Sequence, residues 1–412
     1  MRTNTLARRL LGVTSIRCRG VEVAEDGLVF EVRPSWQRPR CGGCGKRAPG
    51  YDRLEARRWQ HLAVGAVILW LRYAPRRVSC ASCGIRAEKV PWGESPSRFT
   101  SALEELAAYF AQLTDKTAVT RLLAIAWRTV GNIVERVVGG RLDPGRLDDL
   151  RFIGVDEFSY RKRHRYITVI VDHVQSRVVW SAKGKSAETV AAFFAELGAE
   201  RAGKIEVVTM DMSAAYIQAV REHAPKAQIV FDRFHVQRLS GDALDEVRRA
   251  QVRGLDDPEA RQAIKNSRFA LLRNLWNLDK DDKTKLSEVQ NNNKTLYRGY
   301  LLHHALAHVL GYAQRGRAEK GLEEWLSWAS RSRLKPFVKL ARTIRNHKDN
   351  ILAYVEYRLT NGVVEGINNR LRMIARRAYG FHSAGALIAM LFLCCGGITL
   401  NPPLPRTVAL PT

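Results

Sequence analysis

Two short apolar stretches of the chain run directly into carboxylates. The stretch RFIGVDEF contains Asp156, and the stretch IEVVTMD ends at Asp211. Apolar runs of this length are typical of buried strands. An acid that ends such a strand lies at the edge of a sheet, where a metal ion can reach it, although aspartate is also a common turn former there. A third acid, Glu365, stands in the helix predicted by TNGVVEGINNRLRMIARRAYG.

Three carboxylates of this kind suit phosphodiester chemistry. Cleavage requires a deprotonated water or sugar hydroxyl and a stabilised leaving oxygen, and two Mg²⁺ or Mn²⁺ ions about 4 Å apart supply both. Mg²⁺ prefers hard oxygen ligands, which two strands and one helix would provide here. Without a cation the acids should repel one another, so at least one pKa should be raised. Three other acids compete for these roles: Glu157, Asp172 and Asp232.

The chain is strongly basic, with 67 Lys and Arg against 41 Asp and Glu and a formal net charge of +26 over 412 residues. Such a surplus favours a polyanionic partner, above all nucleic acid; a merely basic enzyme and an anionic membrane are weaker alternatives. The N-terminus lacks the apolar core of a signal peptide. Glycines and a Pro-Pro pair interrupt the uncharged stretch between His382 and Arg406, which favours a buried C-terminal helix over a membrane span. We expect a soluble, cytoplasmic protein.

Four of the seven cysteines form two CxxC pairs that are 35 residues apart. Two such turns can close a tetrahedral Zn²⁺ site, and the intervening AVILWLRYAPRRVSC predicts a strand that brings them together. The odd number of cysteines argues against a disulfide framework. Buried free thiols and a redox pair are the alternatives to the zinc site. The predicted zinc ligands are Cys41, Cys44, Cys80 and Cys83. Nearby arginines are candidates for DNA phosphate contacts, or simply solvated charges: Arg57, Arg58, Arg76 and Arg77.

Helical periodicity begins near Phe99, and the two short periodic segments TAVTRLLAI and AWRTVGNIVERVVGG follow. The pair resembles a helix-turn-helix, whose second helix would start near Trp127 and enter the major groove of DNA. A plain helical pair explains the degenerate pattern equally well. The residues that would face base edges are Arg128, Thr129 and Asn132. The polar stretch RLDPGRLDD then indicates a linker.

Beyond this linker, three β-rich runs precede an alternation of helices and strands. The runs are RFIGVDEF, HRYITVIVDHV and RVVWSAKG. SAETVAAFFAEL, with Ser186 as N-cap, and SAAYIQAVREH predict helices, while IEVVTMD and AQIVFDRFHV predict strands. This order predicts a mixed sheet with helices packed on it. Residues 233–350 read as helical throughout. The tryptophans of that block are expected mainly in its core: Trp276, Trp325 and Trp328.

The helix that contains Glu365 is expected to start after an N-cap at Asn361. Its apolar stripe consists of Val363, Ile367, Leu371, Ile374 and Ala378. The acid shares a second face, at helical spacing, with Asn369, Arg372 and Arg376. A carboxylate followed by amide and guanidinium groups suits a metal ion beside a nucleic-acid backbone, and an ordinary solvated face is the alternative.

Four motifs in this order resemble the DDE transposases of the ISL-three insertion-sequence type. They are GVDEFSYRKRHRY, TMDMSAAY, FDRFHV and NGVVEGINNRLRMIARRAYGF, preceded by a segment similar to that family's zinc finger. The resemblance implies a multidomain α+β and α/β protein, with a ribonuclease-H-like sheet interrupted by a helical insertion. The implied parts are a zinc-finger DNA-binding domain (1–98), a helix-turn-helix (99–142), the catalytic domain (151–232 and 351–400) and the insertion (233–350).

The resemblance also implies an activity and its residues. Asp156, Asp211 and Glu365 match the metal-binding catalytic acids, and His235 lies in a motif that could contact the scissile DNA end, orient a ligand or simply occupy the core. The protein would bind terminal inverted repeats as a homodimer or larger assembly in a prokaryotic nucleoid. It would cleave phosphodiester bonds there and join the 3′-OH ends to target DNA. The alternatives are a zinc-bearing DNA-binding regulator without cleavage activity and a nuclease that cuts without joining.

Overall fold

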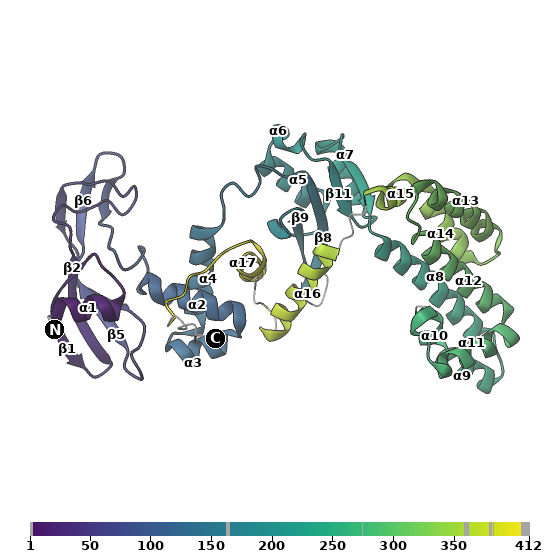
Figure 1. Cartoon of the computed structure of the whole chain (residues 1–412), viewed down its shortest axis with the longest axis horizontal. Helices are drawn as coiled ribbons and strands as arrows, with labels where there is room; N and C mark the ends of the chain where they lie inside the picture. Colours follow the sequence, from purple (N-terminus) through teal and green to yellow (C-terminus); the bar gives the residue numbers. More distant parts are fainter. Residues whose placement is uncertain are drawn as a thin grey trace, which may run out of the picture. The chain divides into compact units, whose positions relative to one another are not determined.

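The computed structural model describes residues 3–161, 165–273, 275–357, 362–378, 381 and 383–404. It divides into two compact units, whose elements are labelled along the chain in Figure 1. Unit 1 comprises Met1–Asp143 and Arg372–Thr412, and unit 2 comprises Pro144–Leu371. The boundary after Asp143 falls in the stretch predicted as a linker. The finer five-part division stays a prediction.

Two small sheets follow the first helix of unit 1. Strands β1 and β2 form an antiparallel hairpin within the sheet β1-β2-β5-β4. The stretch AVILWLRYAPRRVSC was predicted as one strand, which is wrong: β5 ends at Tyr73 and β6 of the second sheet, β3-β6-β7, starts at Arg76. Pro75 lies in the break, where a missing backbone N–H costs least. The bounds are α1 Thr3–Leu11, β1 Ile16–Ala24, β2 Gly27–Pro34, β3 Gly50–Arg53, β4 Arg57–Gln60, β5 Leu69–Tyr73, β6 Arg76–Cys80 and β7 Gly84–Ala87.

The rest of unit 1 is helical. Helix α2 (Ser101–Leu113) begins at Thr100, whose hydroxyl accepts from Leu103 N. Helix α3 (Lys116–Leu123) and helix α4 (Trp127–Arg141) are joined by a turn in which Ala124 takes a left-handed conformation with φ 52°. Helix α17 (Ala384–Cys395) packs on α4 and α2. This confirms the buried C-terminal helix. Within the described part of the chain, no helix is long and apolar enough to cross a membrane.

A five-stranded mixed sheet forms the centre of unit 2. Its order is β10-β9-β8-β11-β12, with β10, β9 and β8 antiparallel and β8, β11 and β12 parallel. This confirms the predicted mixed sheet and its five strands. The stretch AQIVFDRFHV is only partly a strand, because β12 ends at Phe231 and Arg233 already begins a helix. The bounds are β8 Phe152–Arg161, β9 Arg165–Asp172, β10 Arg177–Lys183, β11 Val207–Met210 and β12 Gln228–Phe231.

Helices α5 and α7 follow the sheet strands where the sequence predicts them. Helix α5 begins at Ser186, which forms a capping box with Thr189, so the predicted N-cap is confirmed. Phe193, Val207 and Val208 are fully buried in the core that these elements share. Each large apolar side chain buried in this way stabilises the fold by about 1.5–3 kcal/mol. The bounds are α5 Ala187–Leu197, α6 Ala199–Ala202 and α7 Ala214–His223.

The rest of unit 2 contains a helical block, as predicted, and the tryptophans within it differ. Trp325 is buried and donates its indole N–H to Leu302 O. Trp276 and Trp328 are 81% and 38% exposed, so the prediction that most of the three tryptophans lie in the core is wrong. The block consists of α8 Arg233–Arg253, α9 Pro258–Asn266, α10 Arg268–Leu272, η1 Leu275–Asn277, α11 Lys280–Asn292, α12 Lys294–Val309, α13 Arg315–Arg331, α14 Lys335–Asn346 and α15 Lys348–Tyr357.

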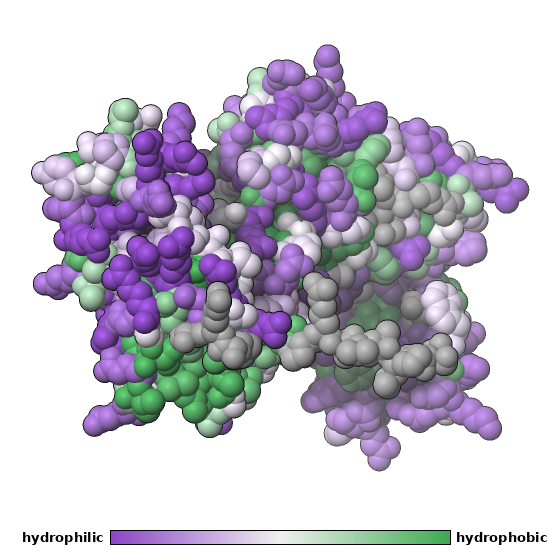
Figure 2. All heavy atoms as spheres, turned by 60° about the vertical axis from the view of Figure 1, so that its left-hand side comes forward, coloured by the Kyte–Doolittle hydropathy of each residue, from purple (hydrophilic) through white to green (hydrophobic). Residues whose placement is uncertain are grey.

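Helix α16 (Gly362–Arg377) has the two faces that the sequence predicts. Its apolar stripe is buried at Ile367, Leu371 and Ile374, with Val364 added to it. The opposite face, including Glu365, is exposed. The predicted N-cap at Asn361 lies outside the described residues. Hydrophilic residues cover most of the molecular face drawn in Figure 2, as expected for a chain of this charge.

Candidate functional site

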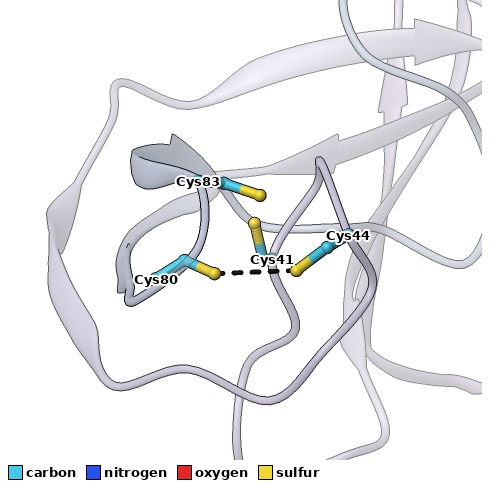
Figure 3. Close-up of side chains that lie close together, drawn as sticks. All are labelled: Cys41, Cys44, Cys80 and Cys83. Atoms are coloured by element: carbon cyan, nitrogen blue, oxygen red, sulfur yellow. Dashed lines mark hydrogen bonds between the residues drawn. The ribbon is translucent and has the colours of Figure 1, made fainter.

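The four CxxC cysteines meet at one point in unit 1. Their sulfur atoms all lie within 4.8 Å of one another, and Cys44 Sγ and Cys80 Sγ are 3.6 Å apart. Figure 3 shows the four side chains pointing inward from two facing turns. All are reduced. Four thiolates converging in this way form the donor set of a structural Zn²⁺ site, so the residues fit the ion that the sequence predicts.

Backbone groups of the two turns support the sulfur atoms. Gly43 N donates to Cys41 Sγ over 3.3 Å. Backbone N–H groups of Ser82 and Cys83 lower the pKa of Cys80 to about 7, because they stabilise its thiolate. A side chain at Gly43 would have its Cβ 3.3 Å from Cys83 Sγ. The backbone around Cys80 therefore favours the deprotonated form of this cysteine, which is the form that binds a metal ion, whereas hydrogen bonding with Cys44 raises the pKa of Cys83.

The arginines near the cysteines are largely engaged within the protein. Arg76 binds the fully buried carboxylate of Glu88, with an Nη2–Oε2 distance of 2.8 Å. Arg58 pairs with Asp26, and Arg77 pairs with Asp52. The guanidinium of Arg57 stacks on Trp59, 4.2 Å from the ring centroid. Because intramolecular carboxylates compensate three of these four charges, their predicted phosphate contacts stay unsupported by the geometry.

The second helix of the predicted helix pair presents the expected side chains. Arg128 and Asn132 are exposed on α4, whereas Thr129 is half-buried. Arg128 and Asn132 line a cavity of about 540 Å³ together with Lys116, whose ammonium lies 4.5 Å from the ring centroid of Trp127. Two of the three predicted base-reading residues are thus accessible.

Asp156 lies in the middle of β8, so the prediction that its strand ends there is wrong. The strand continues to Arg161 because it pairs with β9 on one side, with Asp156 opposite Val169. On the other side, pairing with β11 reaches only Gly154. On the β11 side, Asp156 therefore lies beyond the last paired residue of β8. On the β9 side, it stays within the ladder.

The strand register places Asp156 and Asp211 level with each other. Thr209 pairs with Gly154 in the parallel ladder. Asp211 lies two residues after Thr209, and Asp156 lies two residues after Gly154, so the two acids stand at the same level. Burial raises the pKa of Asp156, and the charge of Asp211 adds to the rise, while the Glu157 N–H, His235 and Asn368 oppose it. The expected rise of a pKa is therefore present, although burial is its largest cause.

Helix α16 reaches this edge through a close contact with β8. A Cβ added to Gly154 would lie 2.5 Å from Val364 Cγ2, so only glycine leaves room for the helix there. One turn further on, Asn368 Nδ2 donates to Asp156 Oδ2 over 2.6 Å. Asn368 is 6% exposed, and its Oδ1 is buried without a partner among the described residues. That oxygen is a hard atom of the kind that Mg²⁺ prefers as a ligand, and it lies beside the predicted metal ligands.

Glu365 and His235 belong to the same neighbourhood. Burial raises the pKa of Asp232, with Glu365 adding to the rise, whereas the Phe234 N–H and His235 lower it. His235 is half-buried in the first turn of α8, and its Nδ1 has no partner among the described residues. The acids are less tightly gathered than the cysteines, since only the cysteines form a close cluster of three or more metal-binding side chains within the described part of the chain.

The rival acids have other partners. Glu157 pairs with Lys185 at 3.3 Å. Asp172 Oδ1 accepts from Val174 N in the turn after β9. Asp232 Oδ1 accepts from Phe234 N and caps α8. Asp232 still interacts electrostatically with His235 and Glu365, and Glu157 directly follows Asp156, to which its N–H donates.

Asn368 and Gly154 were not predicted as site residues. Asn369, Arg372 and Arg376 were predicted because they share the face of Glu365, and all three are exposed as expected. Asn368 lies one position away on the buried side. The Asn-Asn doublet that begins three residues after Glu365 was a signal for it, but which of the two amides points inward depends on the helix orientation.

Comparison with known proteins identifies the family. A family model for ISL3-type DDE transposases, described as Transposase, matches residues 153–391. The transposase for insertion sequence element IS1557 of Mycobacterium tuberculosis, in strains H37Rv and CDC 1551, is 37% identical over 440 aligned positions, covering 98% of both chains. The transposase for insertion sequence element IS1001 of Bordetella parapertussis is 32% identical over 88% of this chain and 90% of its own. Matches of this extent make the chain an insertion-sequence transposase of the ISL3 family of DDE transposases.

Proposed function

We propose that this transposase cuts and joins DNA at the edge of its mixed sheet formed by Asp156, Asp211 and Glu365. The observation that carries the proposal is the arrangement around Asp156. Asp211 stands level with it on the next strand, and the helix of Glu365 donates to it through Asn368. Elements far apart in the sequence thus converge on one carboxylate.

Each residue has a distinct role in this proposal. Asp156, Asp211 and Glu365 would hold the Mg²⁺ or Mn²⁺ ions, which would activate the attacking hydroxyl and stabilise the leaving oxygen. Asn368 holds the Asp156 carboxylate in place, which limits its motion in the absence of the cation. His235, in the first turn of α8 beside these acids, would contact the scissile DNA end. Hydrolysis and joining are both in-line displacements at phosphorus, so one site serves both.

The remaining parts would deliver the DNA. The cysteine cluster with its zinc ion (1–98) and the helix-turn-helix (99–142) would bind the terminal inverted repeats, with Arg128 and Asn132 at base edges. Residues 151–232 and 351–400 would form the ribonuclease-H-like catalytic domain around the insertion 233–350. The strand order, with two antiparallel pairs (β10-β9 and β9-β8) followed by two parallel pairs (β8-β11 and β11-β12), supports this assignment. Pairing two DNA ends calls for a homodimer or larger assembly.

Isosteric variants of the acids test the proposal. Asp156→Asn, Asp211→Asn and Glu365→Gln should each slow cleavage of an inverted-repeat duplex by about 10³-fold or more, since several kcal/mol of transition-state stabilisation would be lost. Binding of the duplex and the zinc content should persist. Glu157→Gln is the matched control and should cleave normally. Wild-type cleavage by any of the three variants would remove that acid from the site, and a wild-type chain that binds but never cuts would indicate a regulator instead.

A further inference from the structure

A second charged site lies in the helical block, apart from the acids. A cavity of about 310 Å³ opens among α8, α10 and α12. Its charged lining consists of Arg238, Asp242, Asp245, Arg249 and Arg268. Helix α12 adds His303 and His304. Neither the proposed function nor the sequence motifs account for this concentration of basic side chains.

The buried carboxylate of Asp245 gathers more positive charge than it can neutralise. Asp245 is 5% exposed. Its Oδ1 accepts from Arg248 Nη2 over 2.7 Å and lies 3.4 Å from Arg268 Nε, while its Oδ2 accepts from Arg249 Nε over 2.7 Å. Three guanidinium groups on one carboxylate leave an excess of two positive charges. The side chains of Arg249 and Arg268 are 63% and 50% exposed, so part of each stays accessible at the cavity.

The rest of the lining adds donors and one opposing acid. Arg238 is exposed and forms no ion pair within the described part of the chain. Asp242 contributes a second negative charge besides Asp245. When Arg248 is counted with the arginines of the lining, an excess of two positive charges remains. Burial lowers the pKa of His303 to about 4, which leaves its imidazole neutral at pH 7. His304 Nε2 is buried and has no hydrogen-bond partner in the same described residues.

We propose that this cavity binds a backbone phosphate of DNA, so that the helical block holds the substrate independently of the acid edge. The proposal rests on DNA being the substrate of this family. Guanidinium groups form bidentate hydrogen bonds with phosphate oxygens, and a pocket of this volume admits a phosphodiester with a flanking sugar.

The test measures DNA binding by the full chain in buffer without added divalent metal, so that cleavage plays no part. The probe is a fluorescein-labelled 30-base-pair duplex, titrated over a series of KCl concentrations. Arg238→Gln leaves the Asp245 cluster intact, and Arg238→Gln combined with Arg268→Gln removes two cavity cations. The matched control is Arg253→Gln, an exposed arginine at the end of the same helix α8 that does not line the cavity.

The plot of log affinity against log salt has a negative slope, and each lost phosphate contact should reduce the steepness of this slope by about 0.9. We expect Arg238→Gln to lower it by about one, and the double variant by about two with roughly tenfold weaker binding or more at low salt, while Arg253→Gln changes little. Equal effects in the control would overturn the proposal, because they would reflect net charge alone. An unchanged slope in the correctly folded single variant would also overturn it. Failure of the acids as a catalytic site would not alter these slopes.

Discussion

The cysteine cluster and the acid edge are both predicted metal sites, but they are built in different ways. The cysteines lie in two tight turns, and their sulfur atoms converge within 4.8 Å of one another. The acids come from β8, from the end of β11 and from α16, and they converge less closely. The first site depends mainly on its ligands and their turns. The second depends on the packing that brings its elements together, so mutations away from the ligands should disturb it.

Loss of one zinc ligand should have the largest effect. Structural zinc contributes about 10–16 kcal/mol of apparent folding free energy in zinc-finger peptides, so Cys41→Ser should release the ion and unfold this part of unit 1. Metal analysis of the purified full chain should fall from one zinc per chain to well below one, and binding to inverted-repeat DNA should be lost. The control Cys18→Ala, at a buried cysteine outside the cluster, should keep its zinc; a zinc-replete Cys41→Ser protein would contradict the assigned ligand set.

A methyl group on Gly154 should disable the acid edge without touching a ligand. Its Cβ would press on Val364 Cγ2, and overpacking of this kind costs about 1–3 kcal/mol. Gly154→Ala should therefore displace α16, reduce cleavage and lower the melting temperature. The added variant Val364→Ala should restore cleavage in part, because it removes the clashing methyl groups.

Gly316→Ala is the matched control for this experiment, since nothing lies within 4 Å of its added Cβ. It should leave cleavage unchanged. If Gly154→Ala cleaves as fast as this control, the packing of α16 on β8 does not govern the site, and the contrast with the cysteine cluster loses its main support.

Asn368→Ala should weaken cation binding rather than abolish the site. Residues that orient metal ligands typically change metal affinity by about 10–100-fold. We expect the Mn²⁺ concentration for half-maximal cleavage to rise by that factor, and direct Mn²⁺ binding, followed by electron paramagnetic resonance, to weaken in parallel. Asn369→Ala, at the exposed neighbour, should leave both values unchanged. Equal shifts in the two variants would show that the hydrogen bond to Asp156 has no special role.

Acid should loosen the unit that carries the cysteines through a buried histidine. Burial lowers the pKa of His61 to about 4, and its Nδ1 lies 2.8 Å from Thr100 Oγ1. The unfolded chain, with a histidine pKa of about 6.5, binds the proton first as the pH falls, so this stabilisation is complete above pH 6.5 and declines toward pH 4. Between pH 7.5 and 5.5 the loss should be about 1.4 kcal/mol.

Hydrogen exchange of the β4 amides can measure this loss locally. Exchange protection should decrease between pH 7.5 and 5.5, after correction for intrinsic rates, and His61→Asn should reduce that pH dependence. His308→Asn, at an exposed histidine of unit 2, should not. Undiminished pH dependence in His61→Asn would assign the effect to other groups, such as the zinc-binding thiols.

Local patterns predicted most of the elements and the ligand types. The CxxC pairs, the apolar stripe of α16 and the alternation of strands and helices each report a short-range periodicity, which the chain keeps in any tertiary context. Errors arose where a strand continued or stopped for reasons outside its own sequence. Asp156 looked like a strand end, but pairing with β9 extends β8 beyond it. The tryptophans of the helical block were expected mainly in its core, yet Trp276 and Trp328 are 81% and 38% exposed.

The amino-acid sequence by itself determined which residue types could bind metal ions and on which kinds of element they would stand, because spacing and hydrophobic period act over a few residues. Only the tertiary structure decided which side chains meet. Asn368 binds Asp156 across more than two hundred residues, Gly154 makes room for Val364, and Glu88 neutralises Arg76 rather than leaving it for DNA. Such contacts depend on strand register and helix rotation, which are set by the packing of the whole core and leave no local pattern in the chain.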